Sequence, residues 1–116
     1  MIVTEVEAGG MPKPWKQKCR FRMLCGLIAR HKLSLVMPGM NSLSHPQKWS
    51  LFDDHVQKHL EFQPEMKPEA FKLFMKMTAK ARRTFKSSLK RHFVRKGLEP
   101  FAKHLYLDLE DWNEFL

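Results

Sequence analysis

The chain has few cysteines and no long apolar run, whereas many cysteines are typical of small secreted proteins and long apolar runs are typical of membrane proteins. Its 116 residues include only two cysteines, Cys19 and Cys25, too few for a disulfide-built secreted fold. The longest apolar run, Met23 to Ala29, has seven residues, whereas a membrane-spanning helix needs about 20. Glu5 and Glu7 are not typical of a secretory signal. We therefore expect neither a membrane span nor a disulfide scaffold, and a reducing compartment is the default.

Acidic side chains are missing from one stretch of the chain. Residues 70–98 contain ten of the 21 lysines and arginines and no Asp or Glu. The other residues carry eleven basic and twelve acidic side chains, which sum to −1, so the net charge of +9 comes from this stretch. A basic segment of this kind most often contacts a polyanion.

The same stretch has the periodicity of a helix. Pro68 suits a first turn and Gly97 suits the position after a last turn, which predicts a helix over residues 68–96. At about 100° per residue, one face collects Ala70, Phe74, Met77, Ala81, Phe85 and Leu89. The opposite face collects the predicted nucleic-acid-binding residues, Lys72, Lys76, Lys80, Arg83, Lys86 and Lys90. The alternative to nucleic-acid binding is that these residues form the ordinary solvent-exposed face of a core helix. Such faces usually carry charges of both signs, whereas this one carries only positive charge.

The whole chain is predicted to be a small, mainly α domain. Residues 1–48 form a poorly defined basic segment, loosely ordered or with a short hairpin made by residues 20–23 and 33–37. Residues 49–116 form the helical segment, with further helices at 49–61 and 108–116. The predicted core comprises Trp49, Phe52, Phe74, Met77, Phe85, Leu89, Trp112 and Phe115.

Catalytic and metal-binding patterns are weak. Asp53 and Asp54 are adjacent, so on a helix they diverge and cannot share a substrate atom. His55 and His59 have a spacing that can hold a metal, but no Cys or His follows at the spacing of a zinc finger. We expect ordinary histidines, with His92 on the inner face of the basic helix. The chain is predicted to be no enzyme and to need no cofactor or metal.

Several short motifs in residues 49–116 occur in a recognisable order. They are Trp49-Ser50-Leu51-Phe52, a segment ending at Phe62, Arg83-Thr84-Phe85-Lys86-Ser87-Ser88-Leu89, Phe93-Val94-Arg95-Lys96-Gly97-Leu98 with Pro100, and Asp111-Trp112-Asn113-Glu114-Phe115. In this order they resemble the plant transposase family of En/Spm (CACTA) elements. The chain departs from the family in having Arg82 or Arg83 where the family has its first Trp. The resemblance implies a helical accessory segment of a transposon-encoded protein, without catalytic residues.

Two functions from different classes follow. The first is non-specific binding of the DNA backbone, or of RNA, through the basic helix, in the nucleus; the cytoplasm is the alternative compartment, and an organellar transit peptide is not expected. The second is an interaction module that self-associates or joins a parent transposase through Trp112, Phe115 and Leu116, because exposed apolar clusters usually mark interfaces. The open-ended last helix also favours a truncated gene copy, which leaves a non-functional fragment as a further alternative.

Overall fold

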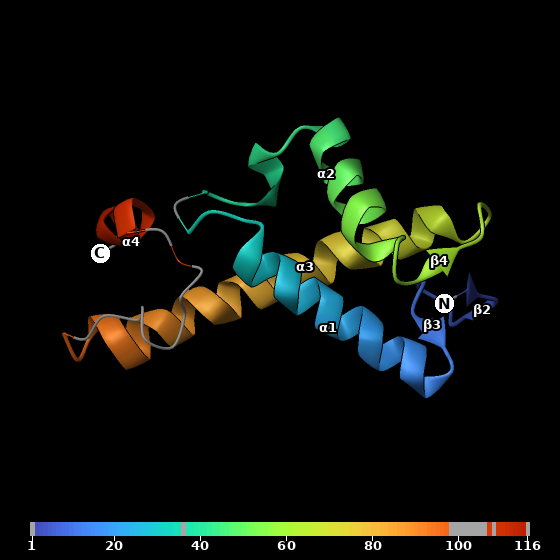
Figure 1. Cartoon of the computed structure of the whole chain (residues 1–116), viewed down its shortest axis with the longest axis horizontal. Helices are drawn as coiled ribbons and strands as arrows, with labels where there is room; N and C mark the ends of the chain where they lie inside the picture. The colour runs from blue at the N-terminus through green and yellow to red at the C-terminus, as the bar shows by residue number, and fades with distance from the viewer. Residues whose placement is uncertain (1, 36, 98–106, 108, 116) are drawn as a thin grey trace.

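The structure is a computed structural model that describes residues 2–35, 37–97, 107 and 109–115. Its elements, in chain order, are β1 (Ile2–Val3), β2 (Glu5–Val6), β3 (Pro12–Lys13), α1 (Trp15–His31), η1 (Met40–Ser42), α2 (His45–Leu51), η2 (Phe52–Val56), β4 (Glu61–Phe62), α3 (Lys67–Leu89), η3 (Lys90–Val94) and α4 (Leu109–Phe115). The mainly α prediction is confirmed. The molecule measures 47 × 29 × 21 Å, and α3 runs along its long axis with α1 lying across it (Figure 1).

The helix predicted over residues 68–96 is present. It begins at Lys67, is α-helical to Leu89, and continues as a π-helical turn, η3, to Val94. Those 28 residues span about 42 Å. Pro68 lies in its first turn, and Gly97 has the positive φ of +67° expected of the residue that follows a helix.

The strand expected at residues 20–23 is wrong, because these residues lie inside α1. Four residues are too few to separate a period of two from a period of 3.6. The longer pattern of Phe21, Leu24, Cys25 and Ile28 follows helical spacing, and all four are buried. A hairpin does occur in the N-terminal third, but it is made by β2 and β3, which pair antiparallel. β1 pairs in parallel with β4, placing Val3 beside Phe62.

The second predicted helix starts four residues earlier than expected. Ser44 and Gln47 form a capping box: the Gln47 N–H donates to Ser44 Oγ at 3.3 Å, and the Ser44 N–H donates to Gln47 Oε1 at 2.8 Å. Pro46 is tolerated because it lies in the first turn. After Leu51 the chain continues as the π-helical turn η2, which ends at Val56 rather than at residue 61.

One aromatic cluster fills the core where these elements meet. Phe52 and Phe74 are fully buried with ring centroids 5.5 Å apart, and Phe52 also contacts Phe62 at 5.8 Å. Burial of a phenylalanine side chain contributes about 2–3 kcal/mol. The residues of this cluster come from both halves of the chain, including Val3, Phe21, Cys25 and Ile28 from the N-terminal segment. The N-terminal segment therefore shares a core with the helical segment.

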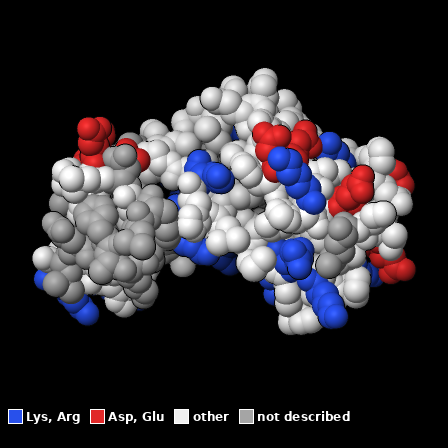
Figure 2. Space-filling view, viewed as in Figure 1, with Lys and Arg blue, Asp and Glu red and all other residues white. Residues whose placement is uncertain are grey.

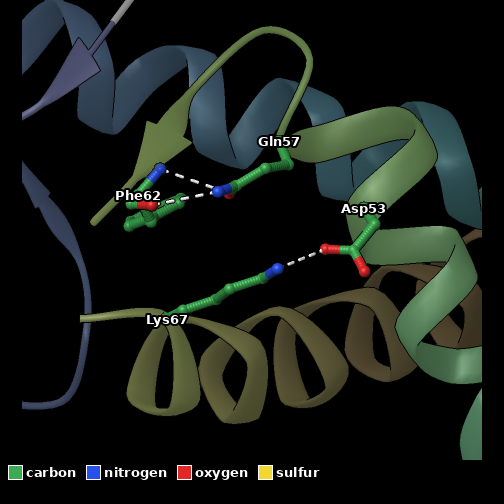
Figure 3. A network of polar contacts seen from close by, with 4 residues as sticks. All are labelled: Asp53, Gln57, Phe62 and Lys67. Carbon is green, nitrogen blue, oxygen red and sulfur yellow. Dashed lines mark hydrogen bonds and ion pairs between the residues drawn. The ribbon is translucent and has the colours of Figure 1, made fainter. Parts of the chain in front are cut away.

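Polar contacts hold the start of α3 against the preceding turn. Lys67 Nζ lies 2.8 Å from Asp53 Oδ1 and 5.6 Å from the Trp49 ring centroid. Gln57 binds the backbone of Phe62 twice: its Nε2 donates to the carbonyl oxygen at 2.9 Å and its Oε1 accepts from the N–H at 3.2 Å (Figure 3). These contacts fix the reversal of the chain between η2 and α3.

A second, smaller cluster forms at the other end of α3. Phe85 and Leu89 pack with Leu35 and with Trp112 of α4. Of the predicted core residues, Phe52, Phe74, Phe85, Leu89 and Trp112 are buried, whereas Trp49, Met77 and Phe115 are half-buried. The expected ends of the last helix, Asp108 and Leu116, lie outside the described residues.

Two neighbouring glycines give a matched test of the packing of the hairpin on α3. Gly9 and Gly10 have φ values of +98° and +93°, but only Gly10 meets α3, where a Cβ would lie 2.6 Å from the Glu69 carbonyl oxygen. An alanine at either position bears the strain of a positive φ, about 1–2 kcal/mol. Gly10→Ala should lower the free energy of unfolding in urea further than Gly9→Ala, because the hairpin must also move away from α3. Equal decreases in the free energy of unfolding would show that the contact between Gly10 and α3 does not contribute to stability.

The two thiols should differ in reactivity. Cys19 is exposed, whereas Cys25 is 1% exposed and burial raises the pKa of its thiol to about 12. Because the thiolate is the reactive form, we expect one thiol per chain to react with a disulfide reagent at pH 8 in the native protein and two to react in denaturant. Cys19→Ser should abolish the native reaction. A rapid native reaction in that variant would contradict the burial of Cys25.

Candidate nucleic-acid interface

The outer face of α3 carries the predicted row of basic side chains. Five of its six members are exposed: Lys72, Lys76, Lys80, Arg83 and Lys90. The row extends about 27 Å from Lys72 to Lys90. The structure therefore displays the charge on one side of the helix and buries the apolar side.

None of these cations is neutralised by a direct ion pair within the described residues. The ion pairs found there join Lys18 to Glu7 at 2.6 Å and Lys67 to Asp53. On the face shown in Figure 2, blue basic side chains lie along α1 and near its crossing with α3, whereas red acidic side chains lie in the upper and right-hand parts of the view, some of them beside blue ones. The described acidic side chains thus form no ion pair with the row.

Lys86 differs from the rest of the row because α4 partly covers it. Its Nζ lies 5.8 Å from the Phe115 ring centroid, and Lys90 Nζ lies 5.5 Å from the same ring. Burial, and then repulsion by Arg82 and Lys90, lower the pKa of Lys86. Such cation–π contacts hold both ammonium groups near α4 with about 0.5–1 kcal/mol. Lys86 is therefore the least accessible member of the row.

Arg82 is a structural residue. It is 5% exposed, and burial lowers its pKa. Its guanidinium Nη2 donates to the Ser34 carbonyl oxygen at 3.0 Å and also to the Met37 carbonyl oxygen. The strand expected at residues 33–37 is absent at the described residues 33–35 and 37: the carbonyl oxygens of Ser34 and Met37 accept from this arginine instead of from a neighbouring strand. At about 80° from Phe74 on a helical wheel, Arg82 lies at the edge of the apolar face, so periodicity alone did not reveal its burial.

Helix α1 adds cations beyond the row predicted on α3. Arg22 is exposed and Arg30 is half-buried, and both line a groove that they share with Lys80 of α3. Residues 8–52 contain eight basic and no acidic residues. This excess of positive charge is the feature of the sequence that could have indicated further cations at the site. Only the packing of α1 on α3 shows which of these cations join the surface of α3.

The histidines and aspartates do not converge. Within the described ranges, no group of three or more His, Cys, Asp or Glu side chains is placed to hold a metal ion. Asp53 pairs with Lys67, and Asp54 accepts a hydrogen bond from Ser50 Oγ at 2.8 Å. Burial, and then the charge of Lys32, lower the pKa of His55.

The prediction that His92 lies on the inner face is wrong, because His92 is exposed. It lies in the π-helical turn η3, whose wider winding shifts the face that each residue presents. Extrapolation of the α-helical period past Leu89 therefore fails at this point.

The predicted interface residues are partly covered by the chain itself. Trp112 is 2% exposed and packs with Leu35, Phe85 and Leu89, and Phe115 is half-buried. Ser34 Oγ donates to Asp111 Oδ2 at 2.9 Å and links α4 to the loop after α1. Trp112 is thus a core residue of the second cluster, and Leu116 lies outside the described residues.

Comparisons of the chain with protein-family models, with curated proteins and with solved structures found no match. The resemblance to En/Spm transposases therefore stays a prediction. Among the described helices, none is long and apolar enough to cross a membrane.

Adjacent arginines allow a structural role to be separated from a surface role. Arg82→Gln removes two hydrogen bonds from a charged donor and should lower the free energy of unfolding by about 2–3 kcal/mol. Arg83→Gln removes the same charge from an exposed position and should change it by less than about 0.5 kcal/mol. Urea denaturation of both variants provides the measurement. If the two variants were equally stable, the bonds from Arg82 to the carbonyl groups of Ser34 and Met37 would not stabilise the fold.

Proposed function

We propose that this protein binds nucleic acid without sequence specificity, through phosphate contacts made by the exposed cations of α3. The observation that carries the proposal is the row of five exposed cations on one helix face, with no ion pair to a described acid. Phosphate contacts release condensed counterions from nucleic acid, which supplies most of the free energy of non-specific binding.

The geometry of the row suits a backbone. Its length of about 27 Å corresponds to about eight base pairs of duplex. Lysine, which makes up most of the row, acts as a point charge without the planar fork that arginine offers to base edges. The aromatic side chains of α3, Phe71, Phe74 and Phe85, are buried and so do not offer stacking surfaces on the row. Contacts to phosphates are therefore favoured over direct reading of bases.

The resemblance to En/Spm transposases supports DNA as the polyanion, because transposon-encoded proteins act on DNA; RNA is the alternative. On this proposal the chain is an accessory segment without catalysis, and the nucleus is its compartment. The rival function, an interaction module built on Trp112, Phe115 and Leu116, has less support because Trp112 is buried within the chain.

The salt dependence of binding tests the proposal. If about four cations contact phosphates, the logarithm of the affinity for duplex DNA should fall against the logarithm of salt concentration with a slope of about −3.6. The triple variant Lys76→Gln, Arg83→Gln, Lys90→Gln should bind all sequences more weakly and with a flatter slope. Fluorescence anisotropy over a series of salt concentrations measures both quantities.

A matched variant controls for net charge. Lys13, Lys32 and Lys58 are exposed and lie outside the row, and replacing all three with Gln removes the same charge. This control should keep the wild-type slope. Equal affinity of wild type and the α3 variant at low salt would refute the proposed role of the row, and so would equal losses in the two triple variants.

A further inference from the structure

The surface of α3 continues into a groove formed with α1. The groove is open to solvent, with a volume of about 660 Å³. Arg22 and Arg30 line it from α1, two helical turns apart, and Lys80 lines it from α3. Thr84 and Ser88 add hydroxyl groups on successive turns of α3, and no acidic side chain is among the residues that line it. Three cations and two hydroxyl groups thus surround one elongated hollow.

The floor of this groove is apolar. Met77 and Ala81 of α3 and Met11 from the loop between β2 and β3 contribute its accessible apolar surface, whereas Phe85, which also lines it, is buried. Met77 and Ala81 are half-buried, so part of each remains available to a ligand. A ligand that fits the groove therefore has negative charge along its edges and a flat or apolar surface between them.

Gly26 keeps space for one of the cations. It lies in the interior of α1, where glycine is less favourable than alanine. A Cβ at this position would lie 3.2 Å from Arg30 Nη1, closer than ordinary van der Waals contact. The guanidinium of Arg30 therefore folds back over the helix at the place where another residue would project its side chain. A side chain at position 26 would move this guanidinium by a few tenths of an ångström.

We infer that the groove between α1 and α3 binds single-stranded nucleic acid, with phosphates on Arg22, Arg30 and Lys80 and base faces on the apolar floor. This inference rests on the proposed function and specifies its ligand. A duplex keeps its bases stacked inside and presents a charged ridge, which leaves the apolar floor without a partner. A single strand offers both a phosphate chain and exposed base faces, and proteins that bind single strands follow that phosphate chain with a basic groove.

The test compares a single-stranded 12-mer with the 12-base-pair duplex of the same sequence, by fluorescence anisotropy at one salt concentration. Arg22→Gln with Arg30→Gln should weaken single-strand binding at least about tenfold more than it weakens duplex binding, because duplex contacts remain on the outer row. Lys16→Gln with Arg20→Gln is the matched control. It removes two charges from α1 at positions that do not line the groove, and should affect both ligands equally.

Two single variants distinguish a direct effect on binding from unfolding of the double variant. Arg22 is exposed, so Arg22→Gln alone should reproduce part of the selective loss while circular dichroism shows an unchanged helix signal. Gly26→Ala keeps every charge, favours helix formation and requires the Arg30 guanidinium to move by only a few tenths of an ångström, so it should leave the binding of both ligands unchanged.

The alternatives give different results. Equal loss of single strand and duplex in the groove variants would overturn the single-strand assignment and leave the proposed function standing. Failure of the wild type to bind either nucleic acid would overturn both. Tight binding of an acidic amphipathic peptide that neither nucleic acid displaces would assign the groove to a protein partner and overturn the inference.

Discussion

The packing of α1 against α3 is the contact on which the remaining structure depends. Phe21, Cys25 and Ile28 of α1 are buried in the same cluster as Phe74 of α3. Because one side of α3 is covered in this way, Lys72, Lys76 and Arg83 are left exposed on its other side. The same contact brings Arg22 and Arg30 beside Lys80 and creates the groove between the two helices. Core packing and the charged surface are therefore two consequences of one helix crossing.

The charge on α3 is unfavourable for the isolated protein. Cations four residues apart on a helix repel one another, and there is no acid between residues 70 and 98 to offset them. Packing at both ends counters this repulsion. Near the start of α3, Trp49 stacks on Phe71 with ring centroids 3.8 Å apart. Near its end, Phe85 and Leu89 pack with Trp112. A polyanion would relieve the same repulsion, which gives binding and stability a common physical basis.

Arg82 and Arg83 illustrate how strongly position decides the role of a side chain. One turns inward and holds the carbonyl groups of Ser34 and Met37, and the other lies in solvent within the basic row. The buried arginine ties the loop after α1 to α3. Ser34 in turn donates to Asp111, which connects that loop to α4. A chain of polar contacts thus joins α3, the loop and α4 beside the second cluster.

The sequence by itself determined the long helix, its boundaries and the separation of its charged and apolar faces, because these depend on local periodicity and on Pro68 and Gly97. It also placed Phe52, Phe74 and Leu89 in the core. It did not reveal α1, since alternation over residues 20–23 fits either period, or the exposure of His92, since a π-helical turn shifts the helix faces. Only the tertiary structure decided that Arg82 is buried and that Arg22 and Arg30 line a groove with Lys80. These assignments depend on how two distant segments cross, and side-chain spacing within one segment carries no information about that crossing.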